Sequence, residues 1–176
     1  MKKGFTLIEI LVTSSIIMIM LSVTIAYTRR SENINKINRA AERVSFDIRR
    51  VANLSMQTRQ IGDRKICAWG IYFDQKNLNQ YVIFSDFCDA SLNGDNKYQE
   101  SEKYEIVKLP INVLIKSSNI DTLVYLPPEP RIYIFKDDYI LNKDAEIILG
   151  EQSGSYQKII NINQAGNINI NTKHDK

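Results

Sequence analysis

The sequence predicts an α+β fold, in which one long N-terminal α-helix packs on a C-terminal, antiparallel β-rich globular head. Three observations predict it: an apolar run from Phe5 to Tyr27, an apolar stripe at helical spacing after that run, and short strand-like runs after Gly62. The composition, with 44% hydrophobic and 24% charged residues in a chain of 176, is that of one folded domain with an appendage.

The apolar run is long enough, as a helix that rises about 1.5 Å per residue, to cross a hydrocarbon core of about 30 Å. Glu9 is its only charged residue, and neither proline nor glycine interrupts it. A secretory signal peptide has a shorter apolar run and a small-x-small cleavage site, which is missing here. We therefore expect residues 5–27 to form a retained membrane-spanning helix, with Lys2 and Lys3 on the cytoplasmic side.

Residues 28–60 continue the helix with an amphipathic pattern. Apolar and small residues recur at spacings of three and four, asparagine and charged residues lie between them, and no helix breaker precedes Gly62. The stripe comprises Ile34, Ile37, Ala41, Val44, Ile48, Val51 and Ser55. We expect it to pack on the domain that follows. A free coiled coil is the alternative, which so short a stripe does not favour.

Residues 61–170 are predicted to form the β-rich head, and residues 171–176 a frayed tail. Short runs rich in isoleucine, valine, tyrosine and phenylalanine alternate with polar turns, as in antiparallel strands of a sheet or small sandwich. In chain order the runs are KICAWGIYF, QYVIFSDF, YEIVKLP, INVLI, TLVYLP, RIYIF, AEIILG, KIINI and NINI. The proline cluster LPPEP marks a loop, because strands resume on both sides of it.

Composition also excludes several classes of function. The net charge of +3 is mild and the charges are interspersed after the N-terminal third, so composition gives no nucleic-acid-binding footprint. One histidine, His174, and two cysteines cannot assemble the usual zinc sites or a Cys–His catalytic site. The sequence shows no phosphate-binding glycine loop, and the carboxylates of Asp137–Asp138 and of Glu100 and Glu102 are expected to be exposed in turns and not to form a buried acid–base pair. We therefore expect a protein that is not an enzyme.

The segment KKGFTLIEILV, residues 2–12, resembles the processing and methylation signal of type IV prepilins and of the pseudopilins of type II secretion. The resemblance implies a leader of residues 1–4, cleavage by prepilin peptidase between Gly4 and Phe5, and N-methylation of Phe5 by the same enzyme. It also implies a bipartite helix with a β-rich head. The segments WGIYFD and KIININQAGNINI further resemble those of GspH/FimT-like minor pseudopilins.

The same resemblance implies a structural subunit with no catalytic residues. Before assembly it would be anchored in the bacterial inner membrane with its head outside. It would then join other pilin or pseudopilin subunits through the N-terminal helix. A minor subunit is favoured over the major one, and the choice between a secretion pseudopilus and a type IV pilus stays open. Two alternatives remain: a filament-tip binding module for DNA uptake or adhesion, and a membrane-anchored calcium-binding protein that never polymerises.

Glu9 places a carboxylate inside the predicted membrane-spanning helix, where a charge is costly in free energy. A carboxylate at this depth costs about 2.5 kcal/mol or more in lipid, so a function is expected of it. In a filament, the N-terminal amine of Phe5 on a neighbouring subunit can pair with Glu9, which would offset desolvation and set the axial register between subunits. The alternative is an incidental charge close enough to the membrane surface to be solvated.

Cys67 and Cys88 are the two cysteines, and both fall in the predicted head. An even number of cysteines in an oxidising compartment favours a disulfide, which would join the first predicted strand to the end of the second. The alternative is two separate buried thiols. A dithiol redox site is not expected, because there is no C-x-x-C motif.

Oxygen-bearing side chains gather in the stretch DFCDASLNGDNKYQESEKYE. They belong to Asp89, Ser91, Asn93, Asp95, Glu100 and Glu102. With Ser91 as position 1, the spacing resembles a degenerate EF-hand calcium loop, although position 1 is not an aspartate and Gly94 is not at position 6. The favoured interpretation is a polar hairpin in which Asn93–Gly94 forms a tight turn, and the calcium site is its alternative. We therefore expect no cofactor, and calcium is the one candidate that the sequence leaves open.

Overall fold

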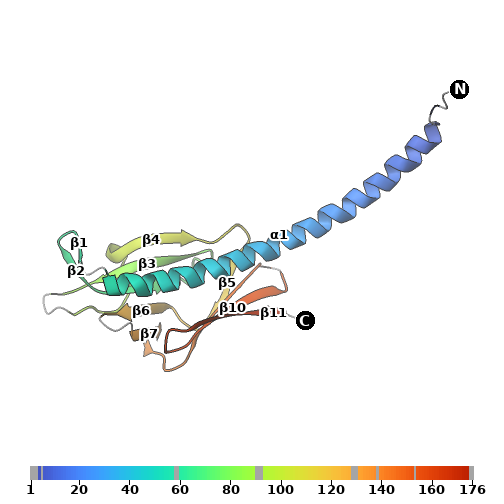
Figure 1. Cartoon of the computed structure of the whole chain (residues 1–176). Coiled ribbons are helices and arrows are strands. Elements are labelled where there is room, and N and C mark those ends of the chain that lie inside the picture. Colours follow the sequence, from blue (N-terminus) through green and yellow to red (C-terminus); the bar gives the residue numbers. More distant parts are fainter. Residues whose placement is uncertain are drawn as a thin grey trace. The chain divides into compact units, whose positions relative to one another are not determined.

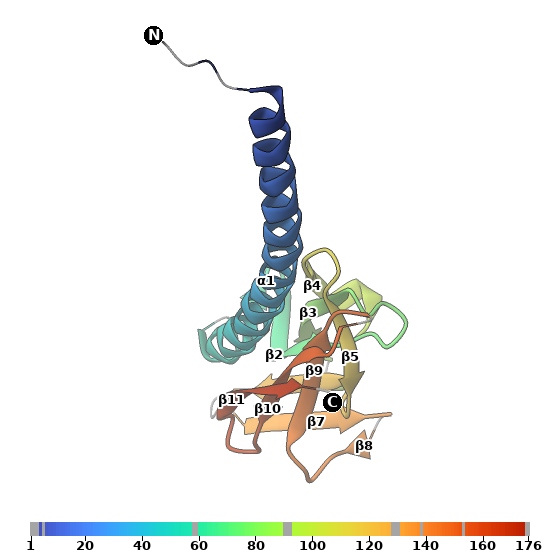
Figure 2. The same ribbon diagram turned by 90° about the vertical axis from the view of Figure 1, so that its right-hand side faces the viewer.

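The computed structural model of the chain describes Gly4 and residues 6–57, 60–89, 93–127, 131–137, 139–152 and 154–174. Figures 1 and 2 show its elements from two directions. In chain order these are α1 (Leu7–Gln57), β1 (Gln60–Ile61), β2 (Arg64–Tyr72), β3 (Gln80–Phe87), the 3₁₀ turn η1 (Glu100–Glu102), β4 (Lys103–Lys108), β5 (Leu114–Ser118), β6 (Thr122–Leu126), β7 (Arg131–Lys136), β8 (Tyr139–Ile140), β9 (Ala145–Gly150), β10 (Tyr156–Ile162) and β11 (Ile168–His174). The chain divides into two compact units, Met1–Asn35 and Lys36–Lys176.

The first unit contains the N-terminal part of α1. Its stretch Leu7–Ile25 is long and apolar enough to cross a membrane, by length and composition, and none of it is buried within the chain. The sequence has no proline or glycine between Leu7 and Gln57, so no residue breaks the backbone ladder of the helix. This stretch is the first half of the helix that the apolar run predicts.

The second unit contains two antiparallel sheets (Figure 2). One has the strand order β4-β3-β2-β6-β7-β8, with β1 paired to β2, and the other has the order β11-β10-β9-β5. The chain passes between the sheets three times, from β4 to β5, from β5 to β6 and from β8 to β9. Each of the predicted runs lies wholly or partly in a strand, so the prediction of a long helix with an antiparallel β-rich head is confirmed.

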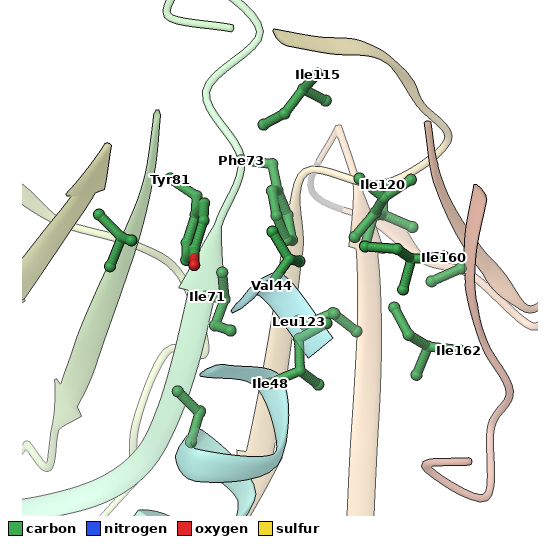
Figure 3. Close-up of a cluster of buried hydrophobic side chains, with 14 of the residues drawn as sticks. Val44, Ile48, Ile71, Phe73, Tyr81, Ile115, Ile120, Leu123, Ile160 and Ile162 are labelled. Carbon is green, nitrogen blue, oxygen red and sulfur yellow. The ribbon is translucent and has the colours of Figure 1, made fainter. Parts of the chain in front are cut away.

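The core lies between the second half of α1 and the sheets. The stripe residues Ile37, Ala41, Val44, Ile48, Val51 and Ser55 are at most 2% exposed, and Ile34 is half-buried. Figure 3 shows Ile48 beside Leu123 of β6 in the middle of the cluster, with Tyr81 of β3 at its left and Ile160 and Ile162 of β10 at its right. The amphipathic helix therefore packs on the head, as its period of three and four predicts.

A buried polar contact accompanies this packing. Asp47 of α1 is fully buried, and its Oδ2 accepts hydrogen bonds from Arg43 Nε at 2.9 Å and from the hydroxyl of Tyr81, on β3, at 2.6 Å. Arg50 Nη1 donates to Glu105 Oε2, on β4, at 2.8 Å. Burial and the contact with Asp47 raise the pKa of Tyr81, so its phenol stays a donor. These bonds fix how α1 is rotated on the sheet.

Two details differ from the sequence prediction. Residues 171–174 belong to β11 and not to a tail, because Asn171 pairs with Ile159 and His174 with Tyr156 across the antiparallel ladder. The tight turn at Asn93–Gly94 is also wrong: neither residue has the positive φ that such a turn needs, and a longer connection separates β3 from β4.

Candidate functional site

The start of α1 is held by a reciprocal cap. The Thr6 backbone N–H donates to Glu9 Oε2 at 2.8 Å and the Thr6 hydroxyl donates to the same oxygen at 2.7 Å. In return, the Glu9 backbone N–H donates to Thr6 Oγ1 at 3.3 Å. This is a capping box, which satisfies backbone donors that the first turn of a helix leaves without partners. It explains why the helix begins at Leu7.

Beyond the cap, the hydroxyl groups of the helix donate hydrogen bonds to backbone carbonyls of the same helix. The hydroxyl of Thr13 donates to the Glu9 carbonyl at 2.8 Å, and the hydroxyl of Ser15 donates to the Leu11 carbonyl at 2.8 Å. Ser14, Ser22, Thr24 and Thr28 make bonds of the same kind, three or four residues back along the helix. Such back-bonding lets hydroxyl groups lie in a medium without water.

The apolar side chains of this stretch point outward on all sides. Leu7 is 82% exposed, Ile17 57% and Ile25 54%. A soluble chain rarely leaves so continuous an apolar surface uncovered, so the stretch needs lipid or other protein around it. Of the predicted processing residues, Gly4 is exposed and has open space where a Cβ would lie, whereas Phe5 lies outside the described residues.

The head contains the predicted disulfide between Cys67 and Cys88, with Cα atoms 5.1 Å apart. Cys67 lies at a β-bulge, where the register between β2 and β3 shifts between Ile66 and Ala68. A bulge turns a side chain away from the regular alternation of a strand. The bond joins β2 to the residue that follows β3, at the start of the acidic connection between β3 and β4.

The described residues among the six predicted calcium ligands do not all come together at one site. Asp89 Oδ1 accepts from the Asn93 backbone N–H at 3.0 Å, and Glu100 contacts Lys103 and Tyr98. Ser91 lies outside the described residues.

The other two, Asp95 and Glu102, meet an aspartate that the prediction did not include. One carboxylate oxygen each from Asp86, Asp95 and Glu102 lie within 4.8 Å of one another. Burial raises the pKa of Asp86 to about 6, and the charges of Glu102 and Asp95 act in the same direction. Burial also raises the pKa of Glu102. The arrangement is one that a cation would stabilise.

Sequence reasoning missed Asp86 because it belongs to the strand-like run QYVIFSDF. The signal was present, since Asp86 is a carboxylate in a strand whose other residues are mostly apolar, and it is fully buried. The capping box was also readable, because Thr6 and Glu9 have the T-x-x-E spacing before an apolar run.

Comparison with known proteins identifies the N-terminal segment. Residues 1–25 match the family model of the prokaryotic N-terminal methylation motif. No curated protein matches the chain. Among solved structures, the minor pseudopilin EpsH from the type 2 secretion system of Vibrio cholerae is similar, at 8% identity and a TM-score of 0.46, over 77% of this chain and 96% of that chain. A likeness at this score carries no inference about the head.

The motif covers the capped start of α1 and the apolar stretch that follows it, up to Ile25. The cap, the uninterrupted helix and the continuous apolar surface are the local structure on which the motif lies. Residues 1–25 of the chain therefore carry a prokaryotic N-terminal methylation motif, which is the signal found at the start of prepilins.

Proposed function

We propose that this chain is a minor pilin-like structural subunit, which a prepilin peptidase processes and which then assembles into a type II secretion pseudopilus or a type IV pilus. The observation that carries the proposal is the methylation motif over residues 1–25, on a helix whose apolar side chains are exposed. That the chain is not an enzyme is part of this proposal.

The peptidase would cut between Gly4 and Phe5 and methylate the new N-terminus at Phe5. The open space around Gly4 supports this role, because a protease must reach the backbone at the bond that it cuts. The bond also precedes the capped first turn of α1, so cleavage does not require the helix to unwind. We expect a bulky residue in place of Gly4 to block cleavage.

Glu9 would contribute to assembly. Within its own chain, only Oε2 of its carboxylate takes part in the cap, and no described residue donates a hydrogen bond to Oε1. That oxygen is available to the N-terminal amine of Phe5 on a neighbouring subunit. The pair would offset the cost of burying both charges between helices and would fix the axial register.

The membrane is the proposed location before assembly. The stretch Leu7–Ile25 would span the inner membrane with the N-terminus in the cytoplasm and the head outside, since Lys2 and Lys3 precede it. On assembly, the same apolar surface would be buried against the helices of other subunits. The minor role rests on the resemblance of WGIYFD and KIININQAGNINI to segments of minor pseudopilins.

Two variants of Glu9 test the proposal in the native host. Glu9→Gln keeps a side chain that can form a capping box but removes the charge, whereas Glu9→Leu removes both. We expect both variants to be cleaved and membrane-bound but depleted at least tenfold from purified filaments, as each lacks the charge that pairs with Phe5. Immunoblots of filament and membrane fractions measure this.

Two results would count against the proposal. Incorporation of Glu9→Gln at the wild-type level would show that the cap, and not the charge, is what assembly needs. A mature wild-type protein whose N-terminus is not methylated Phe5, by mass spectrometry, would remove the processing step. It would favour a membrane-anchored protein that does not polymerise.

A further inference from the structure

The connection between β3 and β4 holds a cluster of carboxylates that the proposed processing and assembly steps do not use. Asp86 lies near the end of β3, Asp95 in the connection and Glu102 in η1. Oxygens from all three lie within 4.8 Å of one another. Asp86 is 0% exposed and Glu102 6%, so two of the three carboxylates have lost nearly all contact with water.

The second observation is a set of buried oxygens without partners. Asp86 Oδ2 accepts from the Asn96 backbone N–H at 2.9 Å, and Glu102 Oε1 accepts from the Phe87 backbone N–H at 3.0 Å. The other oxygen of each carboxylate, Asp86 Oδ1 and Glu102 Oε2, is buried and has no hydrogen-bond partner among the residues that the structure describes. Asn96 Oδ1 is a third buried oxygen of this kind. Buried oxygens of carboxylates are very costly to leave without a donor or a cation.

In the described part of the chain, no basic side chain compensates for these charges by direct contact. Among the residues that the structure describes, neither a lysine nor an arginine forms an ion pair with Asp86, Asp95 or Glu102. Arg64 lowers the pKa of Glu102 through its charge, but burial outweighs it and the pKa of Glu102 is raised. The guanidinium of Arg64 lies 3.8 Å from the centre of the Phe87 ring.

The backbone of the connection is shaped to these carboxylates. A Cβ at Gly94 would lie 2.1 Å from Asp86 Oδ2, so the chain passes Asp86 more closely than any other residue type allows. Asn96 adopts a φ of 58°, in the left-handed region, and its N–H thereby donates to Asp86. Asp95 is held by the Lys97 backbone N–H and by Gln99 Nε2, each at 2.9 Å.

We propose that Asp86, Asp95 and Glu102, with Asn96 beside them, bind a calcium ion. Carboxylate and amide oxygens are the ligands that Ca²⁺ prefers, and its variable coordination number suits an irregular connection completed by water. Mg²⁺ requires nearly octahedral geometry and keeps most of its water, so we expect it to bind much more weakly. The ligands come from a strand end, a connection and a 3₁₀ turn, and so differ from the continuous EF-hand-like loop that the sequence suggests.

The ion would fix the connection at three points, one of them two residues from the disulfide at Cys88. Calcium would then act on the stability of the head. This inference does not rest on the proposed filament function, because it concerns only residues of the head. Its test uses no filament.

The test is thermal unfolding of the purified full-length chain in detergent micelles. Trp69, the single tryptophan, is 1% exposed in β2 and reports unfolding of the head by fluorescence. After treatment with EDTA, about 10 mM CaCl₂ would be 100-fold above a Kd of about 0.1 mM, and we expect the Tm to rise by about 5–10 °C. The same concentration of MgCl₂ is expected to give a much smaller rise.

Variants assign the effect to the site. Asp86→Asn and Glu102→Gln preserve shape but remove a charged ligand, so each is expected to lose the rise with CaCl₂. In EDTA, each is expected to unfold at or above the wild-type Tm, because a buried charge without a partner has been removed. Asp89→Asn is the matched control: it removes an acidic group of the same connection that lies outside the cluster, and the rise should persist.

Three outcomes would overturn the proposal. The first is a wild-type Tm that does not change with CaCl₂ after EDTA treatment. The second is a rise that is equal with CaCl₂ and MgCl₂, which would indicate a general effect of divalent ions. The third is a rise that persists in both Asp86→Asn and Glu102→Gln. If one variant fails to fold, the other decides, and calorimetric titration of the wild type with CaCl₂ gives an independent reading.

Discussion

The two halves of α1 differ in what surrounds the same residue types. Ile17, in the first half, is 57% exposed, whereas Ile48, in the second half, is fully buried. In the first half, apolar residues occupy all sides of the helix, and in the second they form one stripe with a polar face opposite. A helix with a polar face can be satisfied by one partner and water, but one without it needs an apolar environment all round. The apolar stripe of the second half therefore packs on the head of the same chain, whereas the apolar surface of the first half needs lipid or another protein to cover it.

The largest effect should separate the halves by truncating one isoleucine in each. We expect Ile48→Ala to lower the free energy of unfolding of the head by about 2–5 kcal/mol, because it opens a cavity in the packed core. The matched change Ile17→Ala removes the same atoms from an exposed site and is expected to alter it by less than about 0.5 kcal/mol. Trp69 fluorescence during denaturation of the detergent-solubilised chain measures both. Equal effects would contradict the division.

A smaller effect should come from removing one tyrosine hydroxyl at each half of α1: that of Tyr81 on β3, which contacts the second half, and that of Tyr27 in the first half. Tyr81→Phe removes the hydroxyl that donates to buried Asp47, and we expect it to destabilise the head by about 1–2 kcal/mol. Tyr27→Phe removes a hydroxyl from a side chain that is 77% exposed, and it should leave the unfolding curve unchanged. If Tyr81→Phe were as stable as the wild type, the hydrogen bond to α1 would not contribute to docking of the helix.

The smallest effect concerns the first turn of α1. Thr6→Val removes the cap hydroxyl, and we expect amide hydrogen exchange in the first turn to become roughly fivefold faster while the Tm of the head stays the same. Thr13→Val is the control, because it removes a hydroxyl that bonds only to helix carbonyls. Exchange measured by mass spectrometry in micelles would contradict the cap if the two variants behaved alike.

Much of the fold was predictable because it depends on local periodicity. The stripe from Ile37 to Val51 recurs every three or four residues and packs on the head alone. Strands with alternating apolar residues are recognised from their own sequence in the same way. The end of β11 was not predictable in this way, since Asn171 and His174 are polar and are held by pairing with β10. Pairing between strands is a non-local property, which a single run of residues does not contain.

The candidate sites also differ in whether their residues are contiguous in the sequence or are brought together by folding. The methylation motif and the T-x-x-E cap are contiguous in sequence, so the residues that form them can be read directly. The carboxylate cluster is assembled by folding: Asp86 comes from a strand, and Glu102 reaches it from sixteen residues further along the chain. Spacing along the chain suggested an EF-hand-like loop, and it could not show that Asp95 and Glu102 lie beside Asp86 in the folded head.

The cap between Thr6 and Glu9 has a consequence for the electrostatics of processing. The N-terminus of a helix carries a partial positive charge of about half a unit from its aligned peptide dipoles. Cleavage after Gly4 would leave Phe5 as the only residue before the cap, so its ammonium group would add a full charge at the same end. One Glu9 would then neutralise only part of this charge. Before the cut, Glu9 of the same chain caps the start of the helix. After the cut, the uncompensated positive charge there would attract the carboxylate of another chain.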